Sequence, residues 1–99
     1  MLTLHIGFGR IEFRLHSSRN LKSKRALLLP LKARLARLFN VACAEVSHLD
    51  QPNLGVLGFS CVSNSGVQAR RILDQIVDYL ESSRSQVEII DHQLEVISF

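Results

Sequence analysis

Residues 54–80, LGVLGFSCVSNSGVQARRILDQIVDYL, carry the pattern that decides the fold. Residues 54–63 are almost continuously apolar, which predicts a strand at a central position in a sheet. The residues that end this run, Ser63-Asn64-Ser65, have the composition of a helix cap. Apolar residues then recur at helical spacing and predict a helix that ends near Ser82: Val67, Ile72, Leu73, Ile76, Val77 and Leu80.

The flanking segments extend this unit in both directions. Residues 41–48 are rich in alanine and valine and predict a strand, which the turn chemistry of residues 50–53 joins to the central strand. Residues 86–99 predict a last strand, and residues 2–16 predict a long first strand.

A helix is expected between the first two strands. Asn20 is a fair N-cap, Asn40 closes the segment, and the apolar residues between them form a stripe at helical spacing. Pro30 interrupts this pattern. It lacks a backbone donor and its ring clashes with the preceding turn, so we expect a kink or a break there.

The resulting order, strand–helix–strand–strand–helix–strand, predicts the fold class. Two right-handed crossover units joined by a hairpin form a ferredoxin-like sandwich, an α+β fold in which a four-stranded antiparallel sheet carries two helices on one face. The chain has 99 residues, so residues 1–99 fit a single domain with one modest core.

The first strand changes its alternation at Gly9. Leu4, Ile6 and Phe8 are apolar at even positions, whereas Ile11 begins an apolar series at odd positions. Either a bulge at Gly9 restores one apolar face, or the strand buries opposite faces along its length and needs a partner to cover one of them.

A sheet with both helices on one face leaves its other face open. The first and last strands are apolar on both alternations, so this face would be a large apolar patch if nothing covered it. We therefore expect a homo-oligomer, with a dimer favoured, whose interface contains Leu4, Ile6, Phe8, Ile89 and Ile97.

Composition narrows the location and the chemistry. Neither a signal peptide nor an apolar run long enough to span a membrane is found, which predicts a cytoplasmic protein without a membrane partner. Cys43 and Cys61 lie in apolar segments without zinc spacing, so we interpret them as reduced core residues. We expect no cofactor and no metal.

Charge is distributed unevenly along the chain. The net charge is +3, but residues 1–40 carry nine basic residues and one acidic residue, whereas residues 41–99 carry three basic and eight acidic residues. An asymmetry of this size is a signal of interaction with a polyanion. Seven of the basic residues fall in or just before the expected first helix: Arg19, Lys22, Lys24, Arg25, Lys32, Arg34 and Arg37.

These basic residues break local rules of helix design. The helix dipole prefers anions in the first turn by about 0.3–1 kcal/mol each, yet that turn holds Lys22, Lys24 and Arg25. No acidic residue lies four positions away to compensate, and like charges recur three apart at Arg34 and Arg37. Uncompensated departures of this kind indicate candidates for function.

Two alternatives stay open for this helix. Lys24 falls on the leucine stripe itself, so it must reach out past the helix end, or a kink must shift the phase. The basic residues could be neutralised by Asp74, Asp78 and Glu81 of the later helix, or they could meet an external anion such as RNA.

Candidate catalytic groups are few. Glu45 and His48 lie three apart on a strand and point to opposite faces, so they cannot share a site without a bulge, whereas His48 and Asp50 could share a face. His5, His48 and His92 could converge only if the sheet order brought them together. We expect no catalytic residues and no enzyme activity.

Five blocks of the chain are distinctive: Gly7–Leu15, Leu21–Arg25 (LKSKR), Phe39–Val41 (FNV), Ala44–Val46 with His48, and Val62–Asn64. They resemble the YlxP-like family of small bacterial proteins, described as a domain of unknown function. The resemblance implies a ferredoxin-like fold and, through genes that often lie beside those of translation factors and ribosome-binding factor A, a role with RNA or the ribosome. Asn20, Ser23 and Pro30 depart from the family's pattern, and an acidic residue is usual where Ser23 stands.

The residues and the resemblance together predict a non-enzymatic protein that associates with RNA or the ribosome through its basic first helix. Residues 54–61 lack the base and paired aromatics with which an RNA-recognition motif stacks single-stranded bases, so we expect contacts with the phosphates of folded RNA. The alternative is an oligomeric regulatory or scaffolding module that binds protein or small molecules through its sheet face.

Overall fold

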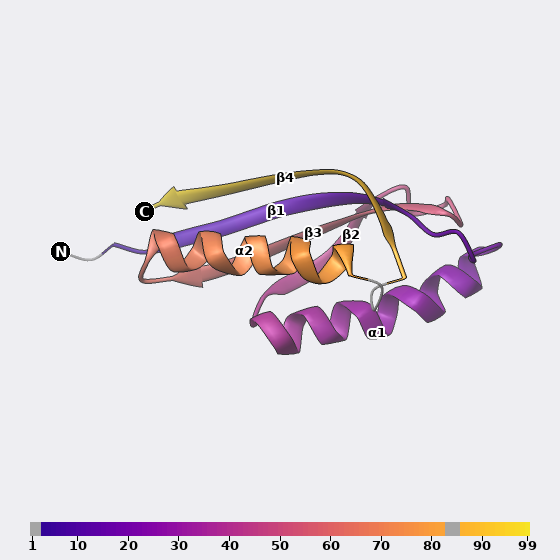
Figure 1. The fold of residues 1–99 in the computed structure, drawn as a ribbon, viewed down its shortest axis with the longest axis horizontal. Coiled ribbons are helices and arrows are strands. Elements are labelled where there is room, and N and C mark those ends of the chain that lie inside the picture. Colours follow the sequence, from indigo (N-terminus) through magenta and orange to yellow (C-terminus); the bar gives the residue numbers. More distant parts are fainter. Residues whose placement is uncertain (1–2, 83–85) are drawn as a thin grey trace.

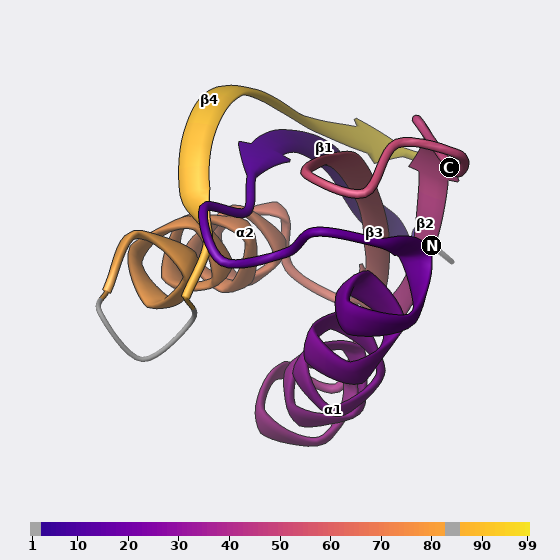
Figure 2. The ribbon, with the colours of Figure 1, turned by 90° about the vertical axis from the view of Figure 1, so that its right-hand side faces the viewer.

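The computed structural model describes residues 3–82 and 86–99 and contains the expected order of elements. They are β1 (His5–Arg14), α1 (Leu21–Phe39), β2 (Ala42–Ser47), β3 (Leu54–Ser63), α2 (Gly66–Glu81) and β4 (Glu88–Ser98). All strand pairs are antiparallel, in the order β2-β3-β1-β4. Both helices lie on one side of the sheet (Figure 1, Figure 2). The ferredoxin-like α+β fold is confirmed.

Side-chain caps set the starts of both helices. Asn20 Oδ1 accepts a hydrogen bond from the backbone N–H of Ser23 at 2.8 Å, and Ser65 Oγ accepts one from the backbone N–H of Gln68 at 3.2 Å. At the other end of α1, Asn40 adopts the left-handed conformation (φ 54°) that commonly terminates a helix.

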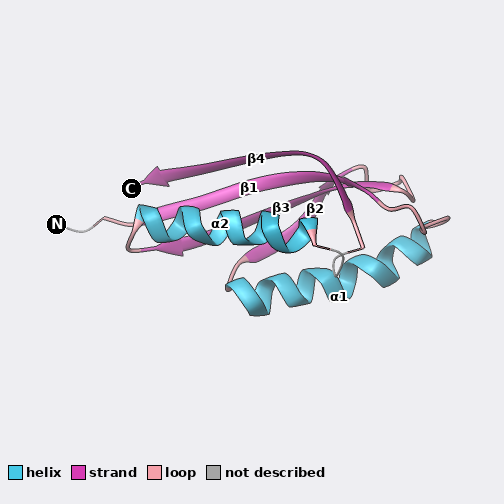
Figure 3. Cartoon of the chain, in the orientation of Figure 1, coloured by secondary structure: helices cyan, strands magenta, loops and turns pink. Residues whose placement is uncertain are grey.

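The helix α1 runs unbroken through Pro30 (Figure 3). Pro30 is exposed to solvent, so its ring projects away from the core. The break that was one of the two expectations does not occur.

Neither helix in the described part of the chain combines the length and apolarity that crossing a bilayer requires.

The core lies between the helices and the sheet. Both helices contribute leucine-rich stripes that are at most 2% exposed: Leu28, Leu31 and Leu35 of α1, and Leu73, Ile76 and Leu80 of α2. The rings of Phe39 and Tyr79 meet edge to face, with centroids 5.9 Å apart, and join the two helices. Leu27 and Phe39 of α1 also pack against this core, whereas the opposite side of the helix is exposed to solvent.

Glycines explain the alternation of β1. The pairings of β1 with β3 and with β4 run through Gly9 without a shift, so no bulge forms there. The odd positions continue on the helix side, where Gly7 and Gly9 lie against core side chains and Ile11 and Phe13 are fully buried. The apolar even positions therefore lie on the opposite face, as the second alternative required.

We expect Gly9→Ala to lower the free energy of unfolding by about 1–3 kcal/mol, because it overpacks the core. A Cβ at this position would lie 2.7 Å from Leu94 Cδ2 and 2.9 Å from the backbone oxygen of Gln93, and backbone cannot easily withdraw. The control is Gly58→Ala, whose Cβ would have a flexible side-chain methyl of Val46 as its nearest neighbour, at 3.1 Å, and the backbone oxygen of Ala44 only at 3.9 Å. Urea denaturation measures both variants, and equal midpoints for the two would contradict this account.

Two bulges change which side chains face the helices. Ile90 of β4 and Val46 of β2 are extra residues in otherwise regular pairings. Because an extra residue reverses the alternation, Ile89 packs against the core on the helix side instead of sharing the opposite face with Ile97. Ile89 is therefore corrected from an expected interface residue to a half-buried residue that packs against the core.

Candidate nucleic-acid interface

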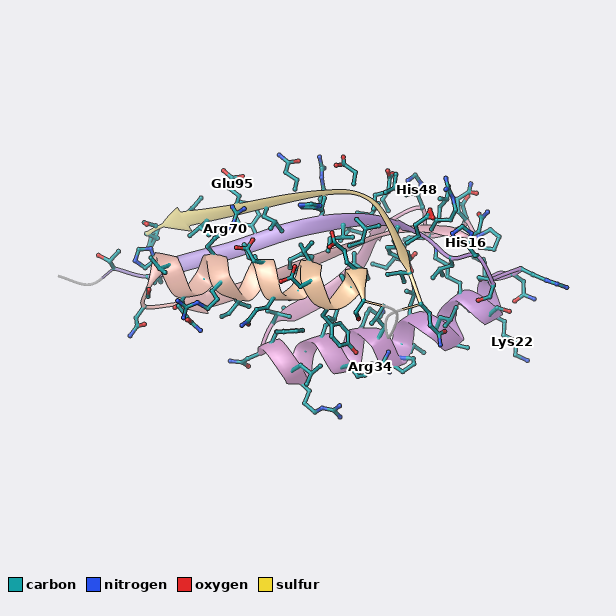
Figure 4. The ribbon with its side chains drawn as sticks, in the orientation of Figure 1. His16, Lys22, Arg34, His48, Arg70 and Glu95 are labelled. Carbon is teal, nitrogen blue, oxygen red and sulfur yellow. The ribbon has the colours of Figure 1, made fainter. Side chains whose placement is uncertain are left out.

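Six basic side chains surround the part of α1 that the sheet does not cover. Four of them are exposed and two are half-buried. Figure 4 shows Lys22 near the start of α1 and Arg34 in its second half, so the charges extend along the whole helix. We call this set the α1 basic surface: Arg19, Lys22, Arg25, Lys32, Arg34 and Arg37.

The α1 basic surface has no carboxylate partner within the described residues, 3–82 and 86–99. Asp74, which could have neutralised it, pairs with Arg70 of α2 itself, with Nε and Oδ1 3.2 Å apart. Asp78 and Glu81 form no ion pair with α1 in the described part of the chain. Internal neutralisation by α2, the alternative left open by the sequence, is not found.

Between its basic residues, α1 presents small apolar side chains to solvent. Ala26, Ala33 and Ala36 are exposed, and Leu29 is 60% exposed. Short side chains let a helix approach another surface closely, while the longer basic side chains reach forward on both flanks. The outer side of α1 therefore carries exposed apolar side chains with basic side chains beside them.

Lys24 does not belong to this surface. Its side chain is only 2% exposed and reaches from α1 to the loop after β2. Nζ donates hydrogen bonds to the backbone oxygens of His48 and Gln51, both at 2.7 Å, and lies 2.6 Å from Glu45 Oε2. Lys24 is therefore corrected from an expected nucleic-acid contact to a buried residue that fastens this loop to α1.

The residues that could have served catalysis are only partly brought together: His48 and His92 line one cleft, whereas Glu45 and His5 lie elsewhere. Glu45 faces the helix side, whereas the His48 imidazole lies on the other side of the sheet, with Nε2 3.4 Å from Glu12 Oε2. His5 Nδ1 lies 2.9 Å from Ser98 Oγ at the opposite end of β1. Within the described residues, no three histidine, cysteine, aspartate or glutamate side chains are close enough to hold a metal ion.

The sequence did not predict a shallow cleft of about 340 Å³ on the face away from the helices. The bulges in β2 and β4, which no local pattern revealed, help to bring its lining together. Its charges have both signs and lie side by side, so the cleft lacks the single-sign field of the α1 basic surface. Its polar lining residues are Arg10, Glu12, Ser47, His48, Asp91 and His92.

Both cysteines are free, as expected for reduced residues in and beside the core. Cys61 is buried, and its Sγ lies 4.0 Å from the backbone oxygen of Ala69. Burial raises the pKa of the Cys43 thiol, although the positive charge of Lys32 acts in the opposite direction. Burial thus favours the protonated thiol of Cys43 at neutral pH.

Comparison with known proteins assigns the family. Residues 6–94 match the family described as "Protein of unknown function (DUF503)". The chain belongs to this family. The uncharacterized protein YlxP of Bacillus subtilis (strain 168) is 31% identical over 77 residues, which are 78% of this chain and 84% of that protein. The resemblance to the YlxP-like family is confirmed.

Among solved structures, the de novo designed protein Foldit4 is similar over 97% of this chain and 96% of its own, with a TM-score of 0.51 and 10% sequence identity. At that identity the likeness is one of fold alone.

Proposed function

We propose that the protein is a non-enzymatic cytoplasmic factor that associates with RNA, and with the ribosome in particular, through the α1 basic surface. The observation that carries this proposal is the absence of a carboxylate partner for any of the six basic residues within the described residues. When the basic side chains of such a surface neutralise phosphates, the counterions that were condensed on the nucleic acid are released. This release is the main source of sequence-independent affinity for nucleic acid.

The arrangement of side chains favours contact with phosphates over stacking on bases. The outer side of α1 carries alanines and leucine between its basic residues, and its one aromatic residue, Phe39, is occupied by Tyr79. The sheet face that stacks bases in an RNA-recognition motif carries Glu12, Asp91 and Glu95 here, and these would repel RNA. Folded RNA, recognised by its shape and its phosphates, fits this surface best.

The family gives independent support. The resemblance to the YlxP-like family implies genes that often lie beside those of translation factors and ribosome-binding factor A, and this favours a ribosomal RNA over other polyanions. The same context favours a binding role over an enzymatic one.

The test is the salt dependence of binding to a fragment of ribosomal RNA, measured by fluorescence anisotropy. If four to six phosphates are contacted, the slope of log K against log salt is about −3 to −5. The protein should also sediment with ribosomes at low salt and leave them at high salt. Failure to bind RNA even at low salt would overturn the proposal.

A second candidate function is that of an oligomeric regulatory or scaffolding module which acts through the sheet face opposite the helices. The observation that favours it is the row of exposed apolar side chains on that face, including Val62 at 72% exposure. A scaffold of this kind would not sediment with ribosomes, so the same experiment separates the two functions.

A further inference from the structure

The strand β4 forms one edge of the sheet, and part of its outer backbone has no hydrogen-bond partner. It pairs only with β1. Leu4 and Phe99 exchange both of their backbone hydrogen bonds, each at 2.8 Å. Such pairs recur at every second residue of an antiparallel ladder, so the N–H and C=O groups of Leu94, Val96 and Ser98 point away from β1. No residue in the described part of the chain bonds them.

This edge is the more regular of the two edges of the sheet. The bulge of β4 lies at Ile90, and the pairing with β1 then continues without a shift to the end of the strand. Asp91 Oδ1 accepts the outward N–H of His92 at 2.9 Å, so the free edge consists of residues 93–99 and extends about 23 Å. The other edge, β2, has only six residues and a bulge at Val46. Short length and bulges protect an edge from pairing, and residues 93–99 have neither.

The charges along β4 have one sign. The strand carries three acidic residues and no lysine or arginine. Arg14 Nη1 lies 3.4 Å from Glu88 Oε1 and compensates that carboxylate. Asp91 and Glu95 form no ion pair within residues 3–82 and 86–99. Asp91 also stands directly opposite Glu12 on β1, where like charges destabilise a sheet. These carboxylates therefore favour a cation from outside the chain.

The side chains of the free edge alternate between two environments. Glu95 and Ile97 lie on the sheet face away from the helices, where Figure 4 shows Glu95. Leu94 and Val96 lie on the helix side and pack against the core. A strand added to β4 would therefore continue an acidic row on one face of the sheet and an apolar row on the other.

We propose that the edge of β4 binds an extended segment of a partner protein in which basic and apolar residues alternate. The backbone of this segment pairs with Leu94, Val96 and Ser98. Its basic side chains lie beside Asp91 and Glu95, and its apolar side chains continue the row on the helix side. A second copy of the chain matches this edge less well, because its own β4 brings the same uncompensated carboxylates to the contact.

This inference goes beyond the proposed function and does not depend on it. The helix α1 packs against β2, at the opposite edge of the sheet. A segment bound at β4 therefore leaves the α1 basic surface uncovered, and binding at either place can fail without the other.

Synthetic peptides with blocked ends test the charge and the backbone separately. The probe is an eight-residue peptide of alternating lysine and valine, and its counterpart alternates glutamate and valine. Calorimetry at about 0.15 M salt, where distant charges are screened, should show about 10-fold tighter binding of the lysine peptide. The lysine peptide should also slow hydrogen exchange of the Leu94 and Val96 amides. If neither peptide binds, or both bind equally, the proposal is overturned.

Methylation of the peptide nitrogens tests the backbone contact without altering the protein. One version of the lysine–valine peptide is N-methylated at its valines and another at its lysines. Since only alternate N–H groups of an added strand face β4, we expect one of the two to bind about 10-fold more weakly than the parent peptide. If both versions bind as the parent does, no strand is added and the proposal fails.

On the protein side, Glu95→Lys should weaken binding of the lysine–valine peptide by about 10-fold. Its matched control is Asp78→Lys on α2, which changes the net charge equally at another exposed acidic residue without a described ion pair. Thermal unfolding checks that both variants are folded. Equal losses in the two variants would assign the effect to net charge and contradict the proposal. So would self-association of the wild type that excludes the peptide, because a second copy would then occupy the edge.

Discussion

Replacing Lys24 by alanine is expected to lower the free energy of unfolding by about 3 kcal/mol. The ammonium group is almost wholly removed from water, and Glu45, whose side chain is 18% exposed, would lose its only ion-pair partner among the described residues. The backbone oxygens of His48 and Gln51 would lose a donor as well. The His48 oxygen keeps the N–H of Gln51 as a donor, but a polar group that is left without a partner costs more than an intact hydrogen bond contributes.

Chemical denaturation of Lys24→Ala beside Lys22→Ala isolates this effect. Lys22 lies two residues away on the same helix but is exposed and has no ion pair within the described residues, so its removal should change stability by less than about 0.5 kcal/mol. A double-mutant cycle with Glu45→Gln then separates the ion pair from the carbonyl contacts. If Lys24→Ala matched Lys22→Ala, the buried contacts of the Lys24 ammonium group could not exist.

Lys24 also marks the limit of what the sequence could predict. Helical spacing places Lys24 on the leucine stripe, unlike the other basic residues of this helix. The structure confirms the difference, because the Lys24 side chain is buried. Its ion-pair partner Glu45 lies on β2, and the two backbone oxygens that accept its hydrogen bonds lie 24 and 27 positions further along the chain, where a backbone oxygen carries no residue-specific signal. Only the packing of α1 against the loop after β2 makes the contact visible.

The same reasoning separates the parts of the fold that were predictable from those that were not. The order of elements follows from local periodicity, although the bulges in β2 and β4 reverse the alternation within those two strands. The side on which Ile89 lies depends on a bulge at Ile90, and that bulge is set by pairing with β1 rather than by the residues themselves. At Gly9 the sequence offered two arrangements, and the close approach of Leu94 selects between them.

These findings divide the basic residues of α1 into two kinds. Lys24 holds the fold together, whereas the α1 basic surface contributes no described ion pair and therefore little to stability. Positions that are dispensable for folding can be changed without unfolding the protein. That property makes the proposed RNA contact open to a direct electrostatic test.

Reversing two charges on α1, with Arg25→Glu and Arg37→Glu together, is expected to weaken RNA binding about 100-fold at low salt and to reduce the steepness of the salt dependence by about two. Both side chains are exposed and without a carboxylate partner among the described residues, so the fold should be unaffected. Arg34 is left unchanged because its Nε is buried, and an effect there would combine binding with stability.

The matched control reverses Arg70 and Arg71 of α2, which changes the net charge by the same amount on the neighbouring helix. Both are exposed, and the exposed pair between Arg70 and Asp74 contributes less than about 1 kcal/mol. If RNA affinity depended only on the net charge of the protein, the two double variants would lose affinity equally, and α1 would not be the site of RNA binding. We expect only the α1 variant to lose RNA affinity and to show a shallower slope of log K against log salt. Because the two variants differ only in where the charge was changed, this result would locate the phosphate contacts on α1.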